Sequence, residues 1–205
     1  LAVFCGRTFS WLLTRLPRRE TIWPIFYQVG VLSLPVVALT GTFIGMVLAV
    51  QSYWHFRPLG LETRLGAVIN MSLVRELGPV LAATMLAGRV GSAMSAELGT
   101  MRVTEQIDAL ESLAYDPVAY LVVPRVLAGL IMVPIVVGLS VAMGIAAGWI
   151  TSLFLLDLST PQFVRGLRLF FEPFDVTFAL IKAASFGLIV TGIGSFFGFT
   201  TRGGA

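Results

Sequence analysis

The sequence predicts an all-α integral membrane protein, and its composition and its long apolar runs carry that prediction. Hydrophobic residues make up 57% of the 205 positions and charged residues only 12%, which leaves too little polar surface for a soluble domain. Thr21–Phe56 and Val126–Leu156 carry no formal charge when His55 is neutral, and Val176–Thr201 carries only Lys182. A helix needs about 20 apolar residues to cross a bilayer, whereas the strands of a membrane barrel alternate over roughly ten residues.

The expected elements form one domain over residues 1–205. They are an interfacial helix (1–20), a first span (29–53), a second span (65–99), a short cytoplasmic helix (104–114), a third span (118–156), an external helix (160–172) and a fourth span (176–199). The first helix is amphipathic, because Cys5, Phe9 and Leu12 recur on one face while Arg7 lies opposite. The excess of arginine in the proposed inner segments places the N-terminus in the cytoplasm.

Small residues mark the faces on which the spans are expected to pack closely. Glycine at such positions lets two helix backbones approach each other. Arg89 and Glu97 lie near one face of the second span, and we expect each of them to pair with another group. The glycines predicted to pack closely are Gly41, Gly45, Gly88, Gly91 and Gly99.

Three charged residues fall inside apolar stretches and need an explanation: Arg75, Glu76 and Lys182. A charge at the centre of a lone membrane helix costs ~2.5–3.5 kcal/mol. Two interpretations stay open at this point. The charges form a buried Glu76–Lys182 or Arg75–Glu76 network that only fixes helix packing, or they line a polar cavity that accepts a charged headgroup. A phosphate would suit Arg75 and Lys182, which both donate charge-assisted hydrogen bonds. Pro79 interrupts the hydrogen-bond ladder nearby, so this helix need not be straight.

A short acidic amphipathic helix is predicted between the second and third spans. Its expected parts are a cap at Thr104, an acidic stripe of Glu105, Asp108 and Glu111, and an apolar face of Ile107, Leu110 and Ala114. About three turns of helix are marginal in isolation, so this helix needs a docking surface on its own membrane domain or on another protein.

The sequence lacks the residues that several kinds of chemistry require. His55 is the only histidine and Cys5 the only cysteine, so we expect no catalytic residues and no metal site. There is no basic run suited to nucleic acid. The chain lacks the G-x-x-x-x-G-K-[ST] phosphate loop, so ATP hydrolysis would belong to a separate polypeptide.

Three stretches resemble one family. They are LVRELGPVLAATMLAGRVGSAMSAELGTMRVTEQIDALE (Leu73–Glu111), DPVAYLVVPRVLAG (Asp116–Gly129) and GTFIGMVLAVQ (Gly41–Gln51). Together they are similar to the MlaE-type permeases of MCE lipid transporters, which are ATP-binding-cassette (ABC) systems. The resemblance extends over nearly all of the chain.

The resemblance implies a homodimeric permease of the bacterial inner membrane with five membrane helices per subunit. It implies that Thr104–Ala114 is a coupling helix in a groove of a cytoplasmic ATPase, and that Arg75, Glu76 and Lys182 belong to a phospholipid cavity. The cavity would open toward a periplasmic MCE-domain protein. ATP and Mg would belong to the ATPase, with no cofactor in this chain. The family has a further helix after the glycines that match Gly203–Gly204, so only four spans are expected here.

Two other functions are weighed against this one. An ion-coupled secondary transporter of an amphipathic substrate would use Glu76 or Lys182, but we find no inverted repeat, and it would not need a docking helix. An intramembrane enzyme is disfavoured, because the spans contain neither an H-E-x-x-H motif nor a histidine base.

Overall fold

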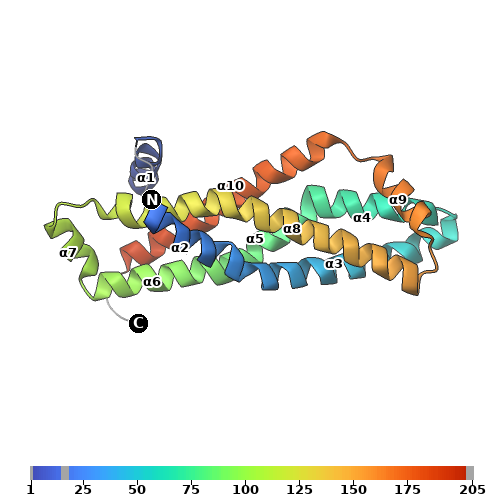
Figure 1. The fold of residues 1–205 in the computed structure, drawn as a ribbon, viewed down its shortest axis with the longest axis horizontal. Helices are drawn as coiled ribbons and strands as arrows, with labels where there is room; N and C mark the ends of the chain where they lie inside the picture. Colours follow the sequence, from blue (N-terminus) through green and yellow to red (C-terminus); the bar gives the residue numbers. More distant parts are fainter. Residues whose placement is uncertain (1, 15–18, 202–205) are drawn as a thin grey trace. The chain divides into compact units, whose positions relative to one another are not determined.

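The computed structural model describes residues 2–14 and 19–201, and these residues form helices and no strands (Figure 1). Four helical stretches among them are long and apolar enough to cross a membrane: Glu20–Leu59, Glu62–Val103, Val118–Leu155 and Pro173–Thr200. At about 1.5 Å per residue, each of these stretches is longer than the roughly 30 Å of hydrocarbon core. The prediction of an all-α membrane protein is confirmed.

The helices gather into two compact units. Unit 1 comprises Leu1–Ser33, Ala83–Val133 and Ala184–Ala205, and unit 2 comprises Leu34–Ala82 and Pro134–Ala183. The helices α5 (Gly78–Leu86), α8 (Val123–Leu155) and α10 (Pro173–Thr200) contribute residues to both units. Each unit is therefore built from segments that lie far apart in the sequence.

Unit 2 contains α3 (Leu34–Phe56), α4 (Leu65–Met71) and α9 (Thr160–Leu169). Its core consists of Ala49, Leu65, Ile69, Leu73, Leu156, Leu158 and Phe163. A Cβ added to Gly45 would clash with the backbone of Gly144, and one added to Gly41 would clash with Ser140. These two glycines of α3 thus lie where the backbone of α8 comes into direct contact.

Unit 1 contains α1 (Ala2–Thr14), α2 (Arg19–Val29), α6 (Ser92–Val103) and α7 (Gln106–Ser112). One of its core clusters joins Leu98, Ile107 and Leu121, and a second joins Val118, Val122 and Val126 with Phe4 packed against it.

The other predicted packing glycines lie in unit 1 and differ from one another. A Cβ on Gly91 would lie 3.6 Å from a methyl group of Val190, and one on Gly99 would lie 3.5 Å from Thr201 Oγ1, which are ordinary contacts. A Cβ on Gly88 would meet no other described atom within 4 Å. Gly88 therefore packs against no other helix within the described chain.

Several element boundaries differ from those expected. The interfacial helix predicted over 1–20 ends at Thr14, and a second helix begins at Arg19; residues 15–18 lie outside the described part of the chain. The external helix predicted over 160–172 ends at Leu169. It begins at Thr160 as predicted, and the side chain of Gln162 accepts a hydrogen bond from the Ser159 N–H at 3.1 Å.

The short acidic helix covers only Gln106–Ser112, and the predicted cap at Thr104 is wrong. The hydroxyl of Thr104 donates instead to the Thr100 carbonyl at 2.8 Å, and Glu105 occupies the cap position without a side-chain bond. Glu105 (φ 58°) and Ala114 (φ 60°) have left-handed backbones, which interrupt a right-handed helix at both ends.

The second and third spans contain wider π-helical turns over Ser72–Leu77, Ala87–Gly91 and Val118–Val122. Two of the three come shortly before a proline, Pro79 or Pro124. Since a proline has no N–H and its ring crowds the carbonyl four residues earlier, a wider turn accommodates it.

Candidate functional site

The first candidate site is an ion-pair network in unit 2, made by Arg75, Glu76, Asp175 and Lys182. Arg75 lies in the π-helical turn Ser72–Leu77, and Asp175 lies in the first turn of α10. The Nε of Arg75 donates to Asp175 Oδ1 at 2.7 Å, and its Nη2 lies 2.7 Å from the same oxygen. The side chain of Asp175 is only 8% exposed, so the guanidinium compensates a buried carboxylate.

Lys182 joins the two halves of the network. Its Nζ lies 2.9 Å from Glu76 Oε2 and donates to the backbone carbonyl of Arg75 at 2.7 Å. The ammonium also lies 4.8 Å from the ring centroid of Phe178, one turn earlier on α10, which is a cation–π distance.

The bond from Lys182 to the Arg75 carbonyl has a cause in the sequence. In a regular α-helix this carbonyl would accept from the N–H of residue 79, but residue 79 is proline and has none. The ammonium of Lys182 donates to this carbonyl, to which Pro79 offers no N–H.

The network is balanced in charge and open on one side. It holds two acidic and two basic side chains, which lowers the cost of placing charges in apolar surroundings. The side chain of Glu76 is 67% exposed, whereas that of Lys182 is 21% exposed. Within this pair, Glu76 is therefore the side chain that is more accessible from outside the network.

The structure brings the three residues singled out in the sequence into one network and adds a fourth, Asp175. Asp175 was not predicted, because it fell between an expected external segment and the predicted start of the fourth span. Its signal was an acidic residue two positions after Pro173, where an acid favours the start of a helix.

The second candidate site is the acidic helix α7 in unit 1. Ile107 is fully buried and packs with Leu98 and Leu121, while Leu110 packs at the edge of this cluster. The acidic side chains of Glu105, Asp108 and Glu111 are exposed. Arg102 Nη1 donates to Asp108 Oδ1 at 2.5 Å, so the stripe is partly neutralised by its own span. The apolar face of α7 thus docks on its own unit and leaves the acidic face exposed, with Asp108 paired to Arg102.

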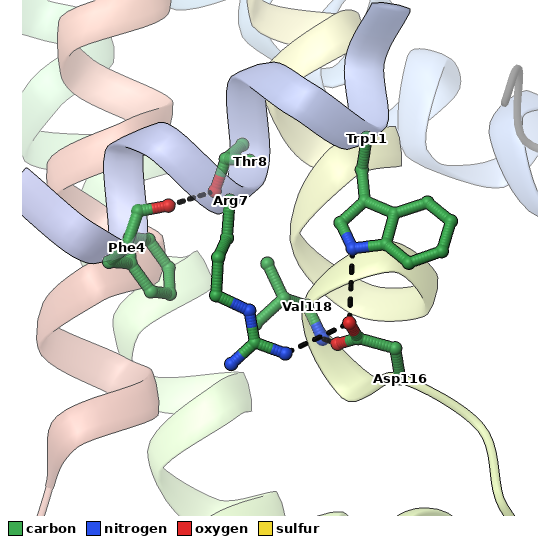
Figure 2. Close-up of polar contacts among 6 residues, drawn as sticks. All are labelled: Phe4, Arg7, Thr8, Trp11, Asp116 and Val118. Atoms are coloured by element: carbon green, nitrogen blue, oxygen red, sulfur yellow. Dashed lines mark hydrogen bonds and ion pairs between the residues drawn. The ribbon is translucent and has the colours of Figure 1, made fainter. Parts of the chain in front are cut away.

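A cluster around Asp116, shown in Figure 2, ties the N-terminal helix α1 to the segment that follows α7. Asp116 Oδ2 accepts hydrogen bonds from Arg7 Nη2 at 2.9 Å and from Trp11 Nε1 at 3.0 Å, and Oδ1 accepts from the Val118 N–H at 3.0 Å. Burial raises the pKa of the Asp116 carboxyl, but these three bonds and the charge of Arg7 outweigh it, so the pKa lies below its ordinary value.

Arg89 and Glu97, expected to pair with other groups, do so separately. Glu97 Oε1 lies 2.9 Å from Nη2 of the buried Arg125. Arg89 Nη1 donates to Ser33 Oγ at 2.8 Å.

Over the described residues, helices with four apolar spans, an ion-pair network within them and an amphipathic helix outside them are compatible with a membrane permease. Family comparison agrees: the family Permease MlaE matches residues 22–205, and the chain belongs to this family.

Relatives extend this assignment. A probable ABC transporter permease protein of Synechocystis is 44% identical over 201 residues, which are 98% of this chain and 76% of that protein. The intermembrane phospholipid transport system permease protein MlaE of Haemophilus influenzae is 39% identical over 84% of this chain and 67% of its own length. The chloroplastic protein TRIGALACTOSYLDIACYLGLYCEROL 1 of Arabidopsis thaliana is 38% identical over 87% of this chain and 51% of its own length. The chain is a multi-pass membrane permease of the ABC transporter class.

Proposed function

We propose that this permease moves phospholipid between the bacterial inner membrane and a periplasmic MCE-domain protein, driven by a separate ATPase. The ion-pair network is the observation that carries the proposal. The printed name of the Haemophilus relative, which refers to intermembrane phospholipid transport, supports the choice of substrate.

The chemistry of the network fits a phospholipid headgroup. Lys182 holds Glu76 in an exposed pair, which exchanges for a pair with an incoming phosphate at little electrostatic cost. Arg75 is 38% exposed on its side chain and keeps further N–H donors beyond those that bind Asp175. A zwitterionic headgroup would place its phosphate on Lys182 and its amine on Glu76.

The ATPase would bind α7 as a coupling helix, and ATP and Mg would be bound there and not by this chain. The support is that α7 exposes Glu105, Asp108 and Glu111 while its apolar side is already buried in unit 1. A partner with a basic groove complements such a surface. In this arrangement the N-terminus is cytoplasmic, and two copies of the permease assemble with the ATPase.

The test is lipid photo-cross-linking next to Lys182. A photoreactive amino acid at Phe178, in the assembled transporter in membranes, should capture phospholipid in the otherwise unchanged protein. Glu76→Lys should reduce the lipid adduct about tenfold, because it places two cations together and removes the exchangeable acid. Glu62→Lys, a reversal in the loop before α4, is the matched control and should leave the adduct unchanged.

Unaltered adduct formation in the Glu76→Lys protein would rule out the network as the lipid site. The secondary-transporter alternative makes a separate prediction, namely lipid movement that continues when the ATPase is inactivated. Transport lost together with ATP hydrolysis supports the ABC mechanism.

A further inference from the structure

Arg89 lies inside a candidate span and has no acidic partner among the described residues. Arg75, Arg125 and Lys182 each pair with a carboxylate. The side chain of Arg89, within Glu62–Val103, makes one hydrogen bond to described residues, from Nη1 to Ser33 Oγ at 2.8 Å. A guanidinium carries five N–H donors and keeps its charge, so most of its donors remain available.

A cavity of about 120 Å³ lies beside this guanidinium, entirely within unit 1. Its lining residues are Gln28, Leu32, Arg89, Val90, Ala93 and Met94. A water molecule needs only about 10–15 Å³ of such space, so the cavity is large enough for a polyatomic anion. Its polar groups are one guanidinium and one amide, and the rest of its wall is apolar.

The backbone at this point is also unusual. Arg89 lies in the π-helical turn Ala87–Gly91, and the neighbouring Gly88 has open space where a side chain would be. Single π-helical turns inside α-helices occur frequently at functional sites. Ser33 holds one nitrogen of Arg89 in place, so the guanidinium is positioned before any ligand arrives.

The residues near the Arg89 cavity indicate that it lies at the depth of the lipid headgroups. Trp23 and Tyr27 of α2 are exposed, and Tyr27 directly precedes Gln28. Exposed tryptophan and tyrosine are enriched at the membrane–water interface. At that level the abundant anions are the phosphodiester groups of phospholipids, and an arginine fork matches them in charge and geometry.

We propose that the Arg89 cavity binds the phosphodiester of a membrane phospholipid. Arg89 and the amide of Gln28 donate to the phosphate, and Leu32, Val90 and Met94 contact the apolar part of the lipid. This site consists of unit 1 residues only, whereas the ion-pair network consists of unit 2 residues. The inference does not depend on phospholipid being the transported substrate.

The experiment places a photoreactive amino acid at Leu32, which is exposed and lines the cavity, in the assembled transporter in nanodiscs of anionic phospholipid. Lipid adducts should form in the otherwise unchanged protein and fall at least about fivefold with Arg89→Gln. Arg89→Lys keeps the charge and should retain most of the adduct, which separates loss of binding from misfolding. Arg165→Gln, which removes an exposed arginine of α9, is the matched control and should change nothing.

Two further arms identify the ligand and separate the sites. Inorganic phosphate at about 10 mM should not compete with the lipid adduct; competition would assign the cavity to free phosphate. Glu76→Lys should leave the lipid adduct at Leu32 unchanged, although it reduces the lipid adduct at Phe178. An adduct that persists in Arg89→Gln, that disappears with Glu76→Lys, or that maps to a peptide of a second copy would overturn the proposal.

Discussion

Lys182 acts on two kinds of acceptor at once, a side-chain carboxylate and a backbone carbonyl. The three charged residues of the network could be predicted, because a charge in a long apolar run stands out in the sequence. The Glu76–Lys182 pair was one of the pairings expected. The Arg75–Asp175 pair was not, because it joins residues 100 positions apart and sequence spacing says nothing about which spans face each other. Asp175 was missed because it lies between the expected external segment and the predicted start of the fourth span.

The first prediction concerns the coupling between Lys182 and Pro79. Lys182→Met should destabilise the protein, since it leaves the Arg75 carbonyl without a donor. In a Pro79→Ala background the new N–H can satisfy that carbonyl, so the same Lys182→Met change should cost about 1 kcal/mol less. Unfolding of the four proteins in mixed micelles measures the difference. Equal costs in both backgrounds would show that Lys182 does not replace the missing donor.

A second prediction at this scale concerns the pH dependence of the Asp116 cluster. Its folded pKa lies below the ordinary value of 3.8, so its contribution is complete above about 3.8 and is lost as the pH falls through the folded pKa. A spin label on Cys5, an exposed position on α1, should therefore show the same mobility from pH 8 to pH 5. The label should become more mobile only below about pH 3.8.

Asp116→Asn should raise the mobile fraction of the Cys5 label roughly fivefold at neutral pH, as expected for loss of about 1 kcal/mol. Asp108→Asn, which removes a carboxylate of α7 that does not contact α1, is the control. Equal mobility in both variants would contradict the anchoring role of Asp116.

At the scale of elements, left-handed backbone conformations near both ends of α7 limit its length, and the residue types at those positions did not predict them. Non-glycine residues seldom adopt positive φ, so Glu105 and Ala114 gave no sign in the sequence that the helix would be confined to Gln106–Ser112. The amphipathic pattern of the segment, in contrast, was sufficient to predict that Ile107 and Leu110 face the core, because they follow helical spacing. Ala114 was expected on the same face, but it lies beyond the end of α7 and is exposed.

The prediction for α7 is that its acidic stripe governs docking of the ATPase. Reversal of Glu105, Asp108 and Glu111 to lysine should abolish co-purification of the ATPase and its stimulation by lipid, while the thermal stability of the permease changes little. The neutral triple change to Gln, Asn and Gln should give an intermediate loss, and Glu20→Lys on α2 should give none. Unchanged co-purification of the ATPase with the charge-reversed protein would contradict the assignment of α7 as the coupling helix.

For the whole molecule, composition and apolar run length were enough to predict a helical membrane protein, since they depend on no tertiary contact. The division into two units was not predicted. It arises because α5, α8 and α10 each serve both units, and a hydropathy pattern does not reveal how one long helix is shared.

The proposed orientation makes the last prediction. One span separates α7 from α9, so the two helices should lie on opposite sides of the membrane. In a Cys5→Ser background, Ser112→Cys should react with a membrane-impermeant maleimide only from the cytoplasmic side, and Gln162→Cys only from the periplasmic side. Labelling of both positions from one side would contradict the four-span topology, and the reverse pattern would invert the orientation.

The Asp116 cluster also bears on how the protein is made. Arg7 and its acceptor are separated by 109 residues, so α1 leaves the ribosome long before its anchor exists. Two spans must be inserted while α1 rests unanchored on the membrane surface, held there only by its amphipathic face. The anchoring of α1 would then show that the chain up to Asp116 has been synthesised and inserted correctly. A ribosome stalled just before the codon for Asp116 would leave α1 free, and one stalled about 40 codons later would leave it anchored.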